Sequence, residues 1–157
     1  MSTLRLAVLS MPAAALGPVN PLPPLVRATD AHETLQADPS IPPEDLRYMG
    51  YGGVPGCLPY GVQDQYNRSR RPRRFRVAVL ENDILRATFL LELGGRLRSL
   101  YHKPSRRELL TVNPVFQPAN LAMRNAWFSG GVEWNIGAIG HSPFTCSPVF
   151  AARVNRP

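Results

Sequence analysis

The sequence predicts a mainly β protein, an antiparallel β-sandwich, and three observations support this fold class. Apolar and polar residues alternate with a period of two from Phe75 onward, as on strands that bury one face. Short polar or glycine-containing turns separate these alternating runs at regular spacing. The 157 residues include 17 prolines, about twice the usual share, which disfavours long helices. The length suits a single domain with a modest core.

The N-terminal segment is expected to contain short elements. Leu4–Leu9 alternates like a strand, and Pro18–Pro24 must be extended because each proline ring fixes φ. Ser40–Asp45 has the pattern of a brief helix capped by its serine. The first residues imitate a secretion signal poorly, because Arg5 is their one basic residue and Pro12 interrupts the apolar run. We therefore expect a retained strand and a cytoplasmic protein, with secretion as the alternative.

Two unusual segments precede the alternating region. Tyr48–Tyr66 is rich in glycine and tyrosine, and we interpret it as an arm across a sheet in preference to a pocket lining. Arg68–Arg76 (RSRRPRRFR) concentrates the positive charge of a chain whose net charge is +7. Such a run is compatible with nucleic-acid binding, but no series of stacking aromatics or RNA-binding signature accompanies it. A linker is the preferred interpretation, and nucleic acid is not the expected partner.

From Phe75 the pattern predicts a meander of antiparallel strands. A polar turn at Glu81–Asp83 joins the first two alternating runs into a hairpin. Gly94-Gly95 then indicates a bend where backbone segments approach closely, because no phosphate-loop pattern follows these glycines. The expected strands are, in order, Phe75–Val79, Leu85–Leu91, Arg96–His102 and Glu108–Val112.

The domain organisation follows from these elements. We expect an N-terminal arm over residues 1–67, an arginine-rich linker over 68–74, and the first part of a β-sandwich domain over 75–157. Val149–Val154 is one more strand candidate near the end of the chain. So few strands leave open edges and an uncovered apolar face. We therefore expect the natural protein to continue beyond Asn155–Pro157 with further strands.

The stretch Asn113–Phe150 is the candidate binding region. It contains both tryptophans, Trp127 and Trp134, together with a carboxylate, several amides and a histidine on backbone interrupted by glycine and proline. Aromatic rings stack on the C–H face of a sugar ring, while amides, Arg and Glu bind its hydroxyls. The alternative is that the aromatic side chains fill a core and that the glycines only permit tight turns.

Catalytic and metal-binding interpretations are weaker. Glu133 and His141 are the residue types that could divide base and acid work, but Glu133 could equally bind a sugar hydroxyl or anchor Arg124, and His141 could hydrogen-bond a turn. No metal or other cofactor is expected, because the three histidines are scattered without a short ligand pair. Cys57 and Cys146 are expected to be free thiols, with one bridge as the alternative. No apolar run reaches the roughly 18 residues that a membrane-crossing helix needs.

Three blocks give the chain a recognisable family character: ELGGRLRSLYHKPSRRELL, NPVFQPANLAMRNAWFSGGVEWN and GHSPFTCSP. In this order they resemble the DUF5107 family, a domain of the galactose mutarotase-like superfamily that often occurs with tetratricopeptide repeats. The resemblance covers about Phe75 to Val154. It implies a β-supersandwich and carbohydrate as the ligand class. The carbohydrate-binding residues expected on this basis and from the aromatic pattern are Arg96, Asn125, Trp127, Glu133, Trp134, Asn135 and His141.

The resemblance does not extend to catalysis. Mutarotases use a glutamate late in the domain, in a region that this chain does not reach, so its role is not transferred to Glu133. We expect a carbohydrate-binding or carbohydrate-processing protein in which this part alone has little or no catalytic activity. The main alternative is a β-scaffold that binds another protein, or a second copy of itself, through its open sheet edges. The sequence identifies neither the sugar nor the oligomeric state.

Overall fold

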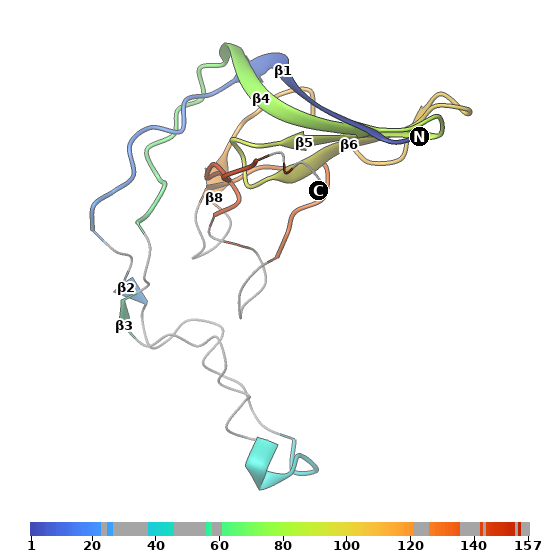
Figure 1. The fold of residues 1–157 in the computed structure, drawn as a ribbon. Helices are drawn as coiled ribbons and strands as arrows, with labels where there is room; N and C mark the ends of the chain where they lie inside the picture. The colour runs from blue at the N-terminus through green and yellow to red at the C-terminus, as the bar shows by residue number, and fades with distance from the viewer. Residues whose placement is uncertain are drawn as a thin grey trace.

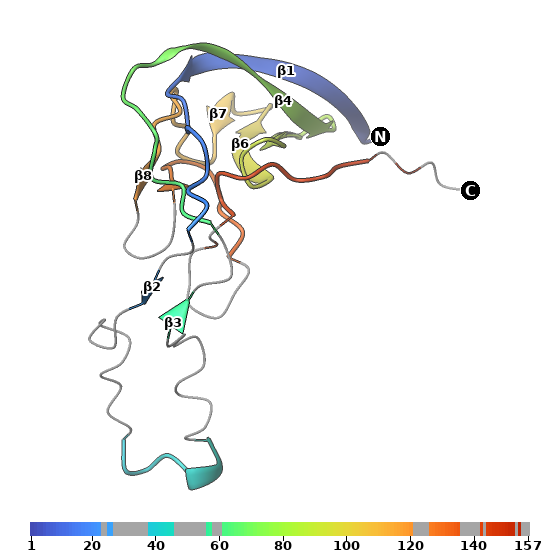
Figure 2. The same cartoon turned by 90° about the vertical axis from the view of Figure 1, so that its left-hand side faces the viewer.

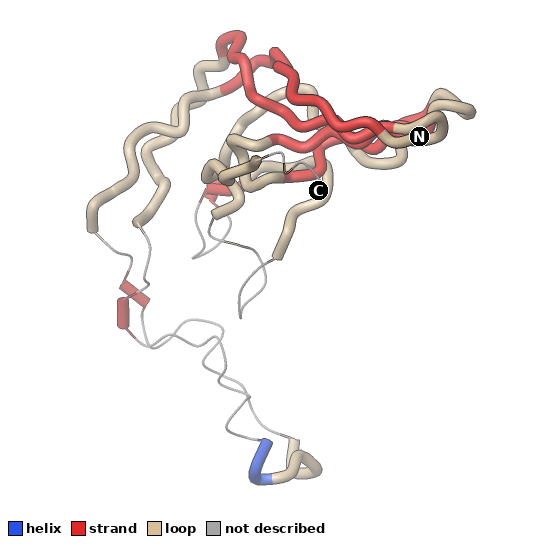
Figure 3. The backbone as a smooth tube through the Cα atoms, viewed as in Figure 1, coloured by secondary structure: helices blue, strands red, loops and turns tan. Residues whose placement is uncertain are grey.

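The computed structural model describes residues 1–22, 25–26, 38–45, 56–57, 61–120, 126–135, 142, 144–152 and 154. It is mainly β, as the sequence predicts (Figures 1 and 3). One antiparallel sheet of five strands has the order β1-β4-β5-β6-β7, and β2-β3 and β8-β9 form two small sheets. The strands are β1 (Thr3–Ala13), β2 (Leu25–Val26), β3 (Gly56–Cys57), β4 (Arg71–Glu81), β5 (Leu85–Leu90), β6 (Arg96–His102), β7 (Arg107–Glu108), β8 (Ala119–Asn120) and β9 (Ala126–Trp127).

Strand β1 joins the start of the chain to the main sheet. It contains the predicted strand Leu4–Leu9 and pairs with β4 along its whole length, from Thr3 opposite Glu81 to Ala13 opposite Arg71. Residues 71–74, which we expected to belong to a linker, are therefore the first residues of β4. The reason is the partner strand: β1 supplies backbone hydrogen-bonding groups opposite the arginines, whose long side chains remain exposed.

The hairpins of the meander lie where the turn residues predict them. Between β4 and β5, the Asn82 side-chain oxygen accepts hydrogen bonds from the backbone N–H groups of Ile84 (2.9 Å) and Leu85 (2.8 Å). This Asx turn explains why the polar triplet closes the hairpin. Strand β6, Arg96–His102, has the bounds predicted from the sequence.

Three expectations about smaller elements were wrong. The predicted strand Glu108–Val112 overlaps β7 at Glu108 alone, because after Leu109 the chain leaves the sheet and the Thr111 carbonyl accepts from Gly131 N instead. In the candidate Val149–Val154, the described residues form no strand, and Val149 N alone reaches a neighbour, the Leu91 carbonyl. Ser40 does not cap the single helical turn at 43–45, because its hydroxyl hydrogen-bonds the Asp38 carboxylate.

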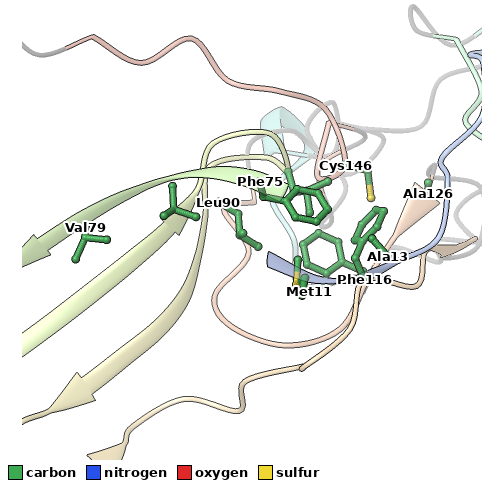
Figure 4. Packing of buried hydrophobic residues seen from close by; sticks show 11 residues of the cluster. Met11, Ala13, Phe75, Val79, Leu90, Phe116, Ala126 and Cys146 are labelled. Atoms are coloured by element: carbon green, nitrogen blue, oxygen red, sulfur yellow. The ribbon is translucent and has the colours of Figure 1, made fainter. Parts of the chain in front are cut away.

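The core lies between the main sheet and the loops that follow it (Figures 2 and 4). Alternation in β4 buries Phe75, Val77 and Val79 on one face. Two loop aromatics complete the centre: Phe116 meets Phe75 edge to face at 6.1 Å between ring centroids, and Phe128 meets Phe116 at 5.1 Å. The remaining core side chains are Met11, Ala13, Leu90, Leu93, Ala126 and Cys146.

The opposite face of the sheet, which we call the outer face, is apolar and open. Leu4, Leu6 and Val8 of β1 are 45%, 71% and 51% exposed, and Leu80 of β4 is 45% exposed. Leu4 lies directly opposite Leu80 in the ladder, so these side chains share one face. The arrangement is a partial β-sandwich with one uncovered layer, as the low strand count predicts. Across the described part of the chain, no helix is long and apolar enough to cross a membrane.

Candidate functional site

Arg96, the first residue of β6, is the buried centre of the candidate site. Its side chain is held by loops, since Nη1 donates to the carbonyls of Phe128 (2.6 Å) and Gly130 (2.8 Å), and Nη2 donates to Thr145 Oγ1 (2.8 Å). The guanidinium carbon also lies 3.8 Å from the centroid of the Phe128 ring. These contacts compensate for taking a charge out of water. Burial lowers the pKa of Arg96, and the charge of Glu133 opposes that shift.

Glu133 and Trp127 form a hydrogen-bonded pair beside this arginine. Trp127 Nε1 donates to Glu133 Oε2 at 2.8 Å, and the Arg96 guanidinium lies 5.7 Å from the Trp127 ring. Both residues are half-buried. Glu133 therefore orients the indole and balances the charge of Arg96. The anchoring of Arg124 suggested by the sequence lies outside the described residues.

Trp134 is held differently and remains accessible. Its Nε1 donates to the carbonyl oxygen of Gly95 at 2.8 Å, while 44% of the residue surface is exposed. The hydrogen bond fixes the direction of the indole, and the exposed ring surface is free to meet a ligand. An oriented, exposed aromatic ring with its polar atom already satisfied is suited to stacking.

The bend at Gly94-Gly95 makes this arrangement possible. Both glycines have positive φ, 66° and 63°. A Cβ on Gly94 would lie 2.7 Å from the Thr145 carbonyl oxygen, and Gly94 N donates to Ser147 O at 2.7 Å. The predicted close approach of backbone segments is therefore confirmed. It places Thr145 against Arg96 and the Gly95 carbonyl at the N–H edge of the Trp134 indole.

These elements enclose a hollow of about 320 Å³, which we call the Arg96 hollow. Arg96, Glu133 and Trp134 line it together, and the C-terminal loop supplies the other wall. At the rim, Phe144 is 56% exposed and Val149 is 37% exposed. The remaining described lining residues are Gly94, Gly95, Ser142, Thr145 and Pro148.

The structure brings together some of the residues predicted from the sequence. Besides the three that line the hollow, Trp127 contacts two of them, Glu133 and Arg96, and is not among the described lining residues. Asn135 is exposed and is not among the described lining residues. Asn125 and His141 lie outside the described residues, and so does the suggested acid–base pair of Glu133 with His141.

Sequence reasoning missed the contribution of the C-terminal loop. Thr145 accepts a hydrogen bond from Arg96, and Phe144 forms part of the rim. Both residues lie in the block GHSPFTCSP, one of the three blocks that carry the family resemblance. The sequence therefore marked this segment as characteristic of the family but did not indicate what its residues do. Ser142 is also buried here, and its hydroxyl accepts from the backbone N–H of Phe144 at 3.2 Å.

The structure also describes the side chain of one of the two cysteines and some of the potential metal ligands. Cys146 is a free, buried thiol in the core, and burial raises its pKa to about 12. It therefore packs as an apolar group and does not act as a nucleophile at neutral pH. The Cys57 side chain is not described. No cluster of three or more potential metal ligands occurs among the described residues.

The fold and the hollow define a mainly β, antiparallel domain with a small aromatic-rimmed pocket. The chain belongs to the DUF5107 family, a domain of unknown function, whose model matches residues 53–155. Its fold is similar to the crystal structure of a TPR-domain containing protein from Parabacteroides distasonis, with a TM-score of 0.63 and 24% identity. The match covers 95% of this chain and 21% of that chain, so this chain spans about a fifth of that protein's length.

Proposed function

We propose that the Arg96 hollow binds a sugar ring. The observation that carries the proposal is Trp134, an exposed indole whose direction is fixed by its hydrogen bond to Gly95 and which forms one wall of a hollow with a carboxylate beside it. The volume of about 320 Å³ lies at the lower end of the range for small-molecule pockets. A sugar ring would stack on the indole and direct a hydroxyl to Glu133.

Arg96 supports such a site without touching the sugar. Its Nη atoms are used by loop groups, and its Nε is buried. Arg96 therefore acts as a positioning residue that fixes the loop carrying Phe128 and Gly130 against the loop carrying Thr145. A preformed hollow lowers the ordering cost of binding.

Binding, and not turnover, is the function that the geometry supports. Glu133 is the single carboxylate among the described lining residues, and it already accepts a hydrogen bond from Trp127. Glycoside chemistry requires a second group to share the proton transfers, and the described lining residues supply none with suitable acidity. A carbohydrate-processing role with His141 stays a prediction.

Tryptophan fluorescence tests the proposal. We expect the emission of the chain to change on titration with one or more members of a panel of neutral mono- and disaccharides. Trp134→Ala should abolish this change, whereas Trp127→Phe, which keeps an aromatic ring, should retain most of the affinity measured by calorimetry. Circular dichroism checks that both variants fold. A lack of response to every sugar, or unchanged affinity of Trp134→Ala, would contradict the proposal.

A second candidate function is protein binding through the outer face. The specific observation is the row of exposed leucine and valine side chains on β1 and β4, which share one face of the sheet and are not scattered singly. We propose a second copy of this chain as the occupant. Leu4, Leu6 and Leu80 lie toward one end of the β1–β4 ladder, Val8 lies opposite Arg76 in its middle, and Arg74 follows toward the other end. Two copies can therefore join through the leucines while the Arg74 side chains stay apart.

A further inference from the structure

Two further hollows are lined by arginines of β4, and one of them shares Pro148 with the Arg96 hollow. Their volumes are about 550 and 580 Å³, and they share Ala15 and Arg73. We call them together the basic cleft. Arg71 lines one part and Arg76 the other, so three arginines contribute to the walls of the cleft. Glu92 is the one carboxylate among its described lining residues.

Glu92 leaves much of this positive charge available. It lies 3.4 Å from Arg73 Nη2 and 3.8 Å from Arg76 Nε, and both distances are long for ion pairs. The two arginine side chains remain 46% and 71% exposed. No ion pair involves Arg71 within the described part of the chain. Because each guanidinium carries five N–H donors, most donors of the cleft are free for an anion.

The basic cleft and the Arg96 hollow share part of their walls. Pro148 lines both, and both are built from the same two segments, Leu93–Arg96 and Thr145–Val149. A ligand that stacks on Trp134 and extends past Pro148 would reach Arg73 and Arg76. A monosaccharide in the Arg96 hollow would not extend into the basic cleft, whereas an oligosaccharide would.

We propose that the ligand is an anionic oligosaccharide, with one ring in the Arg96 hollow and a carboxylate or sulfate of a neighbouring ring in the basic cleft. This inference rests on the proposed function and specifies its substrate class. A guanidinium matches the planar pair of oxygens of a carboxylate, and it binds sulfate oxygens in the same fork geometry. Nucleic acid is a poorer match, because a run of bases needs successive stacking rings, and Phe116, the one aromatic among the cleft's described lining residues, is fully buried.

The first test compares charged and neutral forms of one glycan. The full chain is titrated by calorimetry at low salt with a uronic-acid trisaccharide, with its neutral methyl ester, and with a sulfated trisaccharide. We expect the acidic forms to bind roughly three- to tenfold more tightly than the ester, since each exposed charge pair contributes little. Stronger binding of the uronate identifies carboxylate as the preferred anion, and stronger binding of the sulfated glycan identifies sulfate. Raising the salt concentration should remove the preference.

Matched variants test whether the arginines of the basic cleft cause the preference for the acidic forms. Arg73→Gln/Arg76→Gln should abolish the preference for the acidic forms by lowering their affinity to that of the ester. Arg68→Gln/Arg70→Gln removes the same charge from the same run outside the lining residues, and it should keep the preference. Circular dichroism verifies folding, because the substituted side chains are exposed.

The outcomes separate this inference from the proposed function. If the ester binds and the acidic forms bind no more tightly, the anionic ligand is excluded while sugar binding stands. If both double variants lose the preference equally, the effect is one of net charge and the cleft has no specific role. If no glycan binds, the proposed function itself fails. A single-stranded oligonucleotide that binds more tightly than the glycans and displaces them would also overturn the inference.

Discussion

Arg96 shows how one buried charge can organise two loops. Its guanidinium joins the carbonyls of Phe128 and Gly130 to the Thr145 hydroxyl, and the residue is only 2% exposed. Removing the side chain leaves these acceptors without their donors and opens a cavity, so Arg96→Ala should lower the free energy of unfolding by about 3–5 kcal/mol. Urea unfolding followed by tryptophan fluorescence measures the change.

Arg96→Lys provides the control for charge. A lysine keeps the positive charge, but its compact ammonium cannot reach the same three acceptors in the geometry of a planar fork. We therefore expect Arg96→Lys to recover less than half of the loss caused by Arg96→Ala. A lysine variant as stable as the original chain would show that the charge matters and that the hydrogen-bond geometry does not.

Cys146 provides a second prediction at the residue scale. Burial raises its pKa to about 12, and the unfolded value is about 9.0, so the unfolded thiol ionises first as pH rises. Stability should therefore fall above pH 9, because the unfolded state then releases a proton that the folded state retains. In a Cys57→Ser background, labelling of Cys146 by a thiol reagent at pH 8 should be slow in buffer and fast in urea. Equal rates would show that the core opens at this position.

At the scale of elements, the bend between β5 and β6 holds the candidate site together. Gly94 has φ of 66° and no space for a Cβ, because the rigid Thr145 carbonyl would lie at 2.7 Å. At Gly95, with φ of 63°, a Cβ would meet only the methyl groups of Val149, at 3.3 Å. Gly94→Ala should therefore cost about 2–4 kcal/mol of stability, and Gly95→Ala about 1 kcal/mol.

The two alanine variants also differ in their expected effect on the site. Displacement of Thr145 in Gly94→Ala should loosen its contact with Arg96, so sugar binding should weaken in the fraction that remains folded. Gly95→Ala keeps its carbonyl available to Trp134 and should bind nearly normally. Urea unfolding and calorimetry together test this order, and a Gly95→Ala variant that is less stable than Gly94→Ala would contradict it.

The elements also show what local sequence could predict. β6 was predicted in full because Gly94-Gly95 and the turn after His102 delimit it on both sides. The start of β4 was missed because nothing local indicates that Arg71–Arg74 would pair with β1, about sixty residues earlier in the chain. Trp134 and Glu133, which the sequence predicted as members of one site by residue type, line the same hollow, and their role in binding stays a prediction. Thr145 could not be assigned, since its role depends on the distant bend that brings it against Arg96.

At the scale of the whole molecule, charge at one end of the sheet affects its stability to acid. Glu81 lies between Lys103 Nζ (3.0 Å) and Arg5 Nε (3.3 Å), and the hydrogen bond to Lys103 holds the pKa of Glu81 below its ordinary value of 4.5. The stability that Glu81 contributes through these contacts is present above its ordinary pKa and is lost as pH falls through its lowered pKa. Lys103→Met should therefore lower stability at pH 7 slightly and make no difference at pH 2, as urea unfolding at the two pH values would show.

The outer face is an apolar surface that the described residues of the chain leave uncovered. Apolar side chains on four adjacent positions of β1 and β4 remain in water, although antiparallel sheets usually carry polar residues on a solvated face. Deleting residues 1–74 would not test its role, because the deletion removes β1 and the start of β4. Single substitutions on the face are the better tool.

If two copies join through this face, association should depend on Leu6 and Leu80. Leu6→Lys/Leu80→Lys places two charges in the middle of the proposed contact, where like charges and lost apolar burial both oppose association. Leu22→Lys/Val19→Lys makes the same chemical change at exposed positions outside the sheet. In light scattering over a range of concentrations, the original chain and the second variant should form dimers and the first variant should be monomeric. A chain that is monomeric at every concentration would exclude a second copy as the occupant of the outer face. Sugar binding in the Arg96 hollow would be unaffected by that result, because the hollow lies on the other side of the sheet.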